Sequence, residues 1–201
     1  MMIAALLNLF RRAGQAAASQ WRNLYYRAAG VRMHGYVWMR AVEIPQFHHN
    51  IQLARCSLDR GVVLLCSGER NNKAKLSIGE GSYINRGTFL DAVESLTIGR
   101  HVAIGPGCYI TDHDHGLDPS RPPLAQQMIA APTRIEDWVW IGANAVILKG
   151  VTIGQRTIIG AGSVVTRDLP PNVIAVGVPA RVVRQREASD EPTDLARAAQ
   201  R

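Results

Sequence analysis

Two histidines stand two residues apart in the polar segment TDHDHGLD, at His113 and His115. An unperturbed imidazole titrates close to neutral pH, so either side chain is suited to remove a proton from a hydroxyl group as a general base. If the segment is extended, residues two apart point in a similar direction, and both histidines would face the same site. Pairs of histidines also bind zinc, so the spacing alone leaves a base and a metal site open.

Cysteine and serine nucleophiles are less well supported. The three cysteines, Cys56, Cys66 and Cys108, form no CxxC pair, and the chain lacks a GxSxG motif. An odd number of cysteines without such spacing indicates neither a disulfide framework nor a thiolate zinc site. Cys108 also falls at an inward position of the repeat described next. We therefore expect chemistry without a covalent intermediate on the protein.

A six-residue repeat must position the histidines. An aliphatic residue recurs at every sixth position, and the fourth residue after it is usually small or branched. A single repeat of this length cannot bury its own apolar face, so about ten phased copies are needed to build one core. The aliphatic positions are Ile78, Ile84, Leu90 and Leu96, then after a two-residue slip Ile98, Ile104 and Ile110, and later Ile135, Ile141, Ile147, Ile153, Ile159 and Val165.

This period predicts an all-β solenoid over residues 37–184, in which the first turn is irregular or capped. The phase is lost between Ile110 and Ile135, so residues 111–134 are predicted to form one long external loop, and long loops in compact domains are often functional. Residues 1–36 read as a helical, basic N-terminal segment that stops near Gly30. The polar residues 185–201 are predicted to be a flexible tail.

The charge of the chain is concentrated near its start. Residues 1–60 contain eight arginines against only Glu43 and Asp59, which is a net charge of +6 within a formal total of +7. Such a segment either caps the open end of the solenoid, which we favour, or rests peripherally on an anionic membrane surface. No nucleic-acid-binding module accompanies the arginines. The apolar stretch MMIAALLNLF is too short to span a bilayer and precedes its arginines, so we expect a cytoplasmic protein.

The second block of repeats, DWVWIGANAVILKGVTIGQRTIIGAGSVVTRDLPPNVIAVGVPARVVR, closely resembles the C-terminal half of the hexapeptide-repeat acetyltransferases, notably the maltose, galactoside and capsule-sugar O-acetyltransferases. WIG, GAGSVVT, DLPPN and GVPARV follow in order at fixed intervals, and the resemblance covers roughly residues 76–184. It implies a left-handed parallel β-helix, usually a homotrimer, with acetyl coenzyme A (acetyl-CoA) in a groove between neighbouring coils.

The resemblance also implies roles for individual residues. His115 matches the family's catalytic histidine. His113 is the rival base and is also expected to contact the acceptor. Asn85 matches an asparagine that lines the same site. Asp91 falls near an acidic residue that binds the acceptor sugar, and Trp140 matches a tryptophan at the acceptor end of the groove. The positions that match contacts to acetyl-CoA are Gly142, Ala161, Thr166, Arg167 and Arg181.

These observations together predict an acetyl-CoA-dependent O-acetyltransferase that acts on a sugar hydroxyl of an exopolysaccharide, a capsule or a lipid-linked glycan precursor. The transfer would be direct, with a histidine as the base and without a metal. Two alternatives stay open at this stage. One is an amino-sugar N-acyltransferase of the same fold. The other is a zinc protein like the γ-type carbonic anhydrases, although the HGxxxHG segment typical of those proteins is absent.

Overall fold

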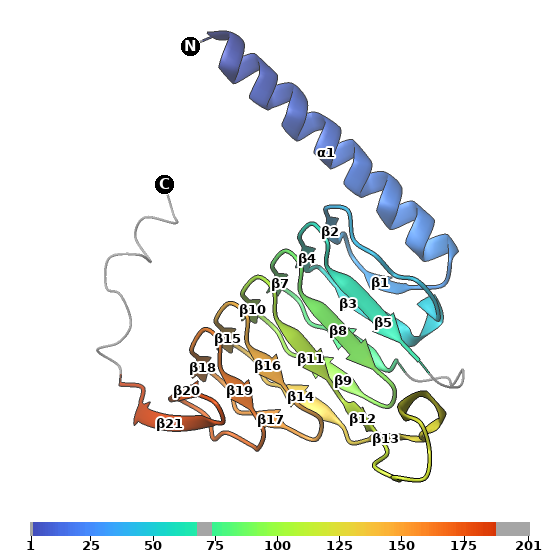
Figure 1. The fold of residues 1–201 in the computed structure, drawn as a ribbon. Helices are drawn as coiled ribbons and strands as arrows, with labels where there is room; N and C mark the ends of the chain where they lie inside the picture. The colour runs from blue at the N-terminus through green and yellow to red at the C-terminus, as the bar shows by residue number, and fades with distance from the viewer. Residues whose placement is uncertain (1, 68–73, 188–201) are drawn as a thin grey trace.

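The computed structural model describes residues 2–67 and 74–187, and Figure 1 shows one long helix standing at the end of a stack of short strands. After the helix the chain visits three parallel sheets in turn and then begins the next turn of the coil. We call these sheets faces A, B and C. A strand inside a sheet hydrogen-bonds to the strands one turn before and after it, as between Tyr83 and Ala103, whereas the last strand, Ala180–Gln185, pairs antiparallel with its neighbour. The repeated order A, B, C makes the chain a three-faced coil.

The strands are short, and their bounds show the repeat directly. Face A contains β1 (Arg32–His34), β3 (Ile51–Ala54), β6 (Leu76–Ile78), β9 (Leu96–Ile98), β14 (Thr133–Ile135) and β17 (Thr152–Ile153). Face B contains β2 (Trp38–Met39), β4 (Ser57–Leu58), β7 (Tyr83–Ile84), β10 (Ala103–Ile104), β15 (Trp140–Ile141), β18 (Ile158–Ile159), β20 (Val173–Gly177) and β21 (Ala180–Gln185). Face C contains β5 (Val63–Cys66), β8 (Phe89–Ala92), β11 (Tyr109–Thr111), β16 (Val146–Ile147) and β19 (Val164–Val165).

The core is the inward stack that the six-residue period predicts. All thirteen predicted aliphatic positions are at most 2% exposed, from Ile78 to Val165. Cys108 also points inward, and its thiol donates a hydrogen bond to the carbonyl oxygen of Gly142. The two-residue slip has a simple cause, because Leu96 and Ile98 both belong to β9 and both point inward from one three-residue strand. These findings confirm the predicted core.

The first turn is irregular, as expected. Parallel pairing already begins at β1, before the predicted start at residue 37. On face C this turn contributes only an isolated bridge between Glu43 and Val63, and the short 3-10 helix η1 (His48–Asn50) precedes β3. Residues 68–73 and 188–201 lie outside the described part of the chain. The latter make up most of the predicted flexible tail.

Helix α1 (Met2–Ala28) confirms the predicted N-terminal helix, and it ends just before Gly30, which has a φ of 110°. Its C-terminal half is attached to the first turn through Ser19, Asn23 and Tyr26. Asn23 donates to the carbonyl oxygen of Val37 and accepts from its N–H, while the Tyr26 hydroxyl donates to Val42. The N-terminal half projects beyond the coil in Figure 1. No helix in the described part of the chain is long and apolar enough to cross a membrane.

The predicted loop 111–134 leaves the coil between β11 and β14 and contains secondary structure of its own. β12 (His113–His115) pairs antiparallel with β13 (Met128–Ala130), and the short 3-10 helix η2 (Pro123–Ala125) lies between them. Thr133 closes the base of this hairpin, since its hydroxyl donates to the carbonyl oxygen of Thr111. The excursion therefore begins as an ordered hairpin that carries both histidines.

Candidate active site

The turns between the faces hold most of the predicted site residues, and they form two separate corners of the coil. The B–C corner consists of the turns that follow the strands of face B. Asn85 follows β7, Gly142 follows β15 and Ala161 lies just after β18, so these three residues share this corner. A Cβ atom on Gly142 would lie 2.5 Å from the backbone nitrogen of Ala161, which shows how closely successive turns stack here.

The C–A corner consists of the turns that follow the strands of face C, and it holds the histidines. The hairpin with His113 and His115 leaves from this corner directly after β11. Thr166 and Arg167 follow β19 at the same corner, and both are exposed. Face C separates the two corners, so one copy of the chain does not bring Asn85, Gly142 and Ala161 together with the histidines.

His113 is held in place by hydrogen-bonding side chains. It is 9% exposed, and its Nδ1 atom lies 3.1 Å from Thr111 Oγ1 and 3.2 Å from Asp112 Oδ1. Its Nε2 atom lies 3.9 Å from Asp91 Oδ2. A base that is oriented by a neighbouring carboxylate is the usual arrangement for general base catalysis. The structure thus gives His113 the surroundings of a positioned base.

His115 lies at the other end of β12 and is exposed. Its strand partner in the hairpin is Met128. Asp114, between the two histidines, is bound by Lys149, whose ammonium group lies 3.2 Å from Asp114 Oδ2 and also donates to the carbonyl oxygen of Ile129. Lys149 therefore ties both strands of the hairpin to the coil, and His115 stays open to an incoming molecule.

Asp91 lies beside this cluster on the outer side of face C, opposite Thr111 on the next turn. Tyr109 donates to its Oδ2 atom at 3.3 Å, but its Oδ1 atom is buried without a hydrogen-bond partner among the described residues. Burial raises the pKa of Asp91, and His113 and Tyr109 oppose that rise. A buried acceptor that lacks a donor is costly and calls for an explanation such as a missing ligand.

Asp112 is a residue of this site that the sequence analysis did not identify. It is fully buried, and its carboxylate accepts hydrogen bonds from the backbone N–H groups of Val93, Glu94 and Ser95 at 2.6–2.8 Å. It thereby fixes the turn between β8 and β9 and, through His113, the start of the hairpin. In the sequence, only its place directly after a strand of the repeat could have indicated this role.

Asn85 lies among charged side chains on the B–C corner. Its Oδ1 atom accepts from the backbone N–H of Arg86 at 2.8 Å and from the Tyr83 hydroxyl at 3.4 Å. The same hydroxyl donates to Asp59 at 3.2 Å. Tyr83 and Asp59 are further neighbours that the sequence analysis missed, and Asp59 comes from the previous turn of the coil.

The two remaining predicted residues lie on face B. Trp140 is 56% exposed on β15, and its outward neighbour one turn earlier is Ala103. Arg181 is exposed on β21, opposite Val176 in the C-terminal hairpin, and it hydrogen-bonds only to the carbonyl oxygen of Ala180 among the described residues. Both side chains are therefore available to a bound molecule.

The cysteine thiols are poorly suited to nucleophilic attack. All three are buried, and burial raises the pKa of Cys56 and of Cys66 to about 12 and raises that of Cys108. A thiol in this state holds almost no thiolate at neutral pH. Within residues 2–67 and 74–187, no three His, Cys, Asp or Glu side chains are grouped as metal ligands would be. Among the described residues, the titratable side chains of the hairpin are therefore the best placed for proton transfer.

Comparison with known proteins gives consistent results. Residues 132–167 match the family model described as bacterial transferase hexapeptide (six repeats). A hexapeptide-repeat acetyltransferase from Vibrio cholerae, solved with acetyl coenzyme A, is 31% identical with a TM-score of 0.59, and the match covers 84% of this chain and 78% of that one. The galactoside O-acetyltransferase of Escherichia coli is 40% identical over 114 residues, which are 56% of this chain and 55% of that protein.

The chain spans about half the length of the curated relatives it matches. A mutant of AntD, an N-acyltransferase from Bacillus cereus solved with dTDP-4-amino-4,6-dideoxyglucose and coenzyme A, has a TM-score of 0.69 over 83% of this chain but is 20% identical. That likeness concerns the fold alone. The three-faced coil described above is therefore shared by relatives that are named as transferring acyl groups to oxygen and by others named as transferring them to nitrogen.

Proposed function

The chain belongs to the family of hexapeptide-repeat acetyltransferases, and from this premise we propose that it transfers an acetyl group from acetyl-CoA to a sugar hydroxyl group. The observation that carries the proposal is the ordered hairpin at the C–A corner, where two histidines lie next to a buried carboxylate with an unpartnered oxygen. The match to the galactoside O-acetyltransferase of Escherichia coli, 40% identical over 114 residues, supports a sugar hydroxyl as the acceptor, while an N-acetyltransferase of Staphylococcus aureus is 38% identical over 89 residues. In keeping with the family, the coil is left-handed.

The reaction we propose is a direct transfer in a ternary complex. The acceptor hydroxyl gives its proton to a histidine Nε2 atom while its oxygen attacks the thioester carbonyl carbon. A backbone N–H of a corner or the Asn85 amide stabilises the oxyanion. The carbon–sulfur bond then breaks, and the thiolate of coenzyme A takes up the proton from the imidazolium. The high pKa values of the buried cysteines support a route without an acyl-enzyme.

We propose His115 as the base and His113 as its alternative. His115 is exposed and matches the family position, whereas His113 is held by Thr111 and Asp112 and is almost fully buried. Asp91 would then bind the acceptor, and Trp140 would pack against it. Gly142, Ala161, Thr166, Arg167 and Arg181 would contact acetyl-CoA.

The division of these residues between two corners favours a homotrimer with sites between copies. The outward side chains of face C are apolar along successive turns, from Val63 through Phe89 and Tyr109 to Val146 and Val164, as expected for a face that a neighbouring copy covers. The C–A corner of one copy would then meet the B–C corner of the next. The supply of acetyl-CoA places this reaction in the cytoplasm.

A thiol-release assay with acetyl-CoA over a panel of sugars, amino sugars and glycan precursors tests the proposal. We expect release with a hydroxyl acceptor, and a loss of about 10²–10⁴-fold in His115→Ala because a general base typically contributes that much. His113→Ala is the matched comparison. A larger loss in His113→Ala would transfer the role of base to His113. Release only with amino sugars would favour an N-acyltransferase, and zinc in the purified protein would favour the carbonic anhydrase alternative.

A further inference from the structure

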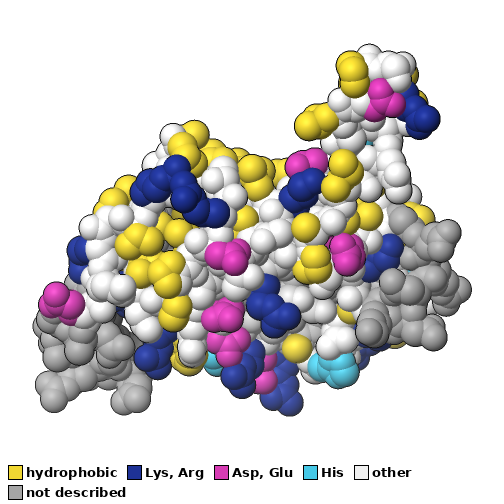
Figure 2. Space-filling view, turned by 90° about the horizontal axis from the view of Figure 1, so that it is seen from below, with side chains coloured by type: hydrophobic (Ala, Val, Ile, Leu, Met, Phe, Trp, Pro, Cys, Tyr) yellow, Lys and Arg dark blue, Asp and Glu magenta, His cyan; other side chains and the backbone are white. Residues whose placement is uncertain are grey.

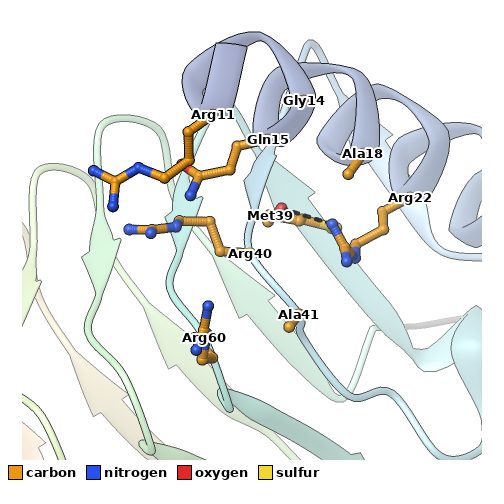
Figure 3. Close-up of a pocket in the computed structure, with 9 residues that line it drawn as sticks. All are labelled: Arg11, Gly14, Gln15, Ala18, Arg22, Met39, Arg40, Ala41 and Arg60. Carbon is orange, nitrogen blue, oxygen red and sulfur yellow. Dashed lines mark hydrogen bonds between the residues drawn. The ribbon is translucent and has the colours of Figure 1, made fainter. Parts of the chain in front are cut away.

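A cleft of about 290 Å³ lies between α1 and the first two turns of the coil. Figure 3 shows Arg11 and Arg22 reaching into it from the helix, and Arg40 and Arg60 from the coil. None of the described residues that line this cleft is acidic. Its volume is near the lower end of the range for small-molecule sites. Four arginines therefore line one concave surface, with Arg22 beside Met39 and apart from the other three.

The positive charge of this cleft is only partly neutralised. Arg40 forms an ion pair with Asp59 at 3.3 Å, but Arg86 approaches the same carboxylate at 3.7 Å. Arg22 donates one long hydrogen bond, of 3.5 Å, to the carbonyl oxygen of Met39. Among the described residues, no ion pair joins the guanidinium group of Arg11 or of Arg60 to an acidic side chain, although the backbone N–H of Arg60 donates to Asp59. Uncompensated like charges in a concave site raise the local potential and attract anions.

The rest of the surface is arranged differently. Figure 2 shows a face on which acidic and basic side chains alternate. Some exposed arginines elsewhere have close acidic partners, as Arg100 has Asp137 at 2.7 Å and Arg55 has Glu80 at 3.0 Å. The arginine cleft differs from these paired sites because four arginines line a single hollow without an acidic residue among its described lining residues.

The arginine cleft continues toward the predicted active site. A second hollow, lined by Arg40, Asp59, Arg60 and Arg86, shares two arginines with it, and Arg86 directly follows Asn85. All four of these residues lie in turns after strands of face B, as Gly142 and Ala161 do farther along. The B–C corner thus presents, in order, arginines, Asn85 and then the predicted acetyl-CoA groove.

We propose that the arginine cleft binds a phosphate or diphosphate group of the acceptor, so that the acceptor is a phosphorylated or diphosphate-linked sugar. This inference rests on the proposed function, in which a sugar hydroxyl lies near Asn85. Guanidinium groups match the oxygens of phosphate in paired hydrogen bonds. The phosphate comes either from a soluble sugar nucleotide or from a lipid headgroup, and exposed Phe10 and Trp21 on α1 are compatible with the latter.

Isothermal titration of the full chain with inorganic pyrophosphate tests the site directly. Saturating coenzyme A is present, so that the phosphate contacts predicted at Arg167 and Arg181 are occupied. We expect Arg11→Gln/Arg60→Gln to bind at least about tenfold more weakly than the unaltered chain, since both charged hydrogen-bonding groups are lost. Arg134→Gln, an exposed arginine on face A, is the matched control and should bind normally. Equal affinity in the double variant, or no binding by the unaltered chain at millimolar pyrophosphate, overturns the proposal.

Two further arms identify the source of the phosphate. Titration with UDP-glucose tests a soluble sugar nucleotide, and co-sedimentation with phosphatidylcholine vesicles with and without phosphatidic acid tests a lipid headgroup. Binding in either arm that the double variant loses supports the arginine cleft. Thiol release in the same preparations separates the two proposals. Pyrophosphate binding without thiol release from any acceptor contradicts only the proposed function, while thiol release that is unchanged in the double variant with phosphorylated acceptors contradicts only the cleft.

Discussion

Asp91 combines a buried carboxylate with an incomplete set of hydrogen bonds. Desolvation raises its pKa above the usual 3.8, so the folded chain holds this proton more tightly than the unfolded chain does. The stability that Asp91 contributes is therefore complete below about pH 3.8 and is lost as the pH rises through the raised pKa. At neutral pH the charged carboxylate opposes folding, as is often found for groups kept for function.

An asparagine at position 91 carries no charge, so it removes the destabilising effect of the buried carboxylate. We expect Asp91→Asn to raise the free energy of unfolding at pH 7 and to match the unaltered chain near pH 3, where both side chains are neutral. Urea unfolding at a series of pH values measures the difference, and thiol release should fall in the same variant. A lower stability of Asp91→Asn at neutral pH would instead mean that His113 and Tyr109 stabilise the carboxylate in full.

Asp112, in contrast to Asp91, should stabilise the folded chain, because its carboxylate accepts hydrogen bonds. Asp112→Ala leaves the N–H groups of residues 93–95 without their acceptor. We expect the free energy of unfolding to fall by about 3–5 kcal/mol, the usual effect of removing one partner from a buried charged network. Asp114→Ala is the matched control two residues away, and losing its exposed pair with Lys149 should cost less than about 1 kcal/mol. Similar values for both variants would contradict the assignment.

The sequence indicates some of these contacts and not others, for a geometric reason. The adjacency of His113 and His115 follows from their spacing, and their place at a loop follows from the lost repeat. Asp91, however, meets His113, and Asp112 meets the backbone of residues 93–95, because one turn of the coil brings residues about twenty positions apart into register. That register depends on the length of the corner between β8 and β9, which the six-residue period does not specify.

At the scale of single elements, the tight corners depend on glycine in two distinct ways. Gly142 has ordinary backbone dihedrals, but a Cβ atom there would collide with the backbone of Ala161 on the next turn. Gly162 has a φ of 69° and open space around its Cα atom. Alanine at Gly162 meets only backbone strain, whereas alanine at Gly142 must push two turns apart.

We therefore expect Gly162→Ala to lower the free energy of unfolding by about 1 kcal/mol and Gly142→Ala by about 3 kcal/mol. Chemical denaturation of both variants measures these values. If acetyl-CoA lies along the B–C corner, Gly142→Ala should also weaken its binding more than Gly162→Ala does. Equal destabilisation by the two substitutions would show that close stacking of the corners adds little to the fold.

The elements themselves were predictable to different degrees. The period fixed which residue of each short strand points inward, and all thirteen positions are buried. The hairpin of β12 and β13 was not foreseen, because Asp114 and His115 are both exposed and no alternation of polar and apolar residues marks the strand. Helix α1 was predicted from its apolar spacing, but its attachment through Ser19 and Asn23 depends on polar groups that such spacing ignores.

At the scale of the whole molecule, the two ends of the coil differ in charge and in the residues predicted to bind ligands. The arginine cleft lies at the N-terminal end of the B–C corner, while the matches to acetyl-CoA contacts lie toward the C-terminal end. Face C, between the two corners, carries an outward row of apolar side chains. An acceptor and a donor that enter from opposite ends of one corner would meet near Asn85, and the histidines must then come from a second copy.

Two inactive variants should therefore restore each other. His115→Ala damages the C–A corner and Asn85→Ala damages the B–C corner, so each variant alone should release little thiol. In a trimer with sites between copies, random mixing of the two chains in equal amounts leaves about a quarter of the interfaces with both corners intact. Co-expression with two different affinity tags, followed by purification of mixed trimers, removes the unmixed trimers and should recover about a third of the activity, because each mixed trimer has one intact interface out of three. A mixture that stays as inactive as its components would place both residues in a site within one chain, and the separation of the corners by face C would then require another explanation.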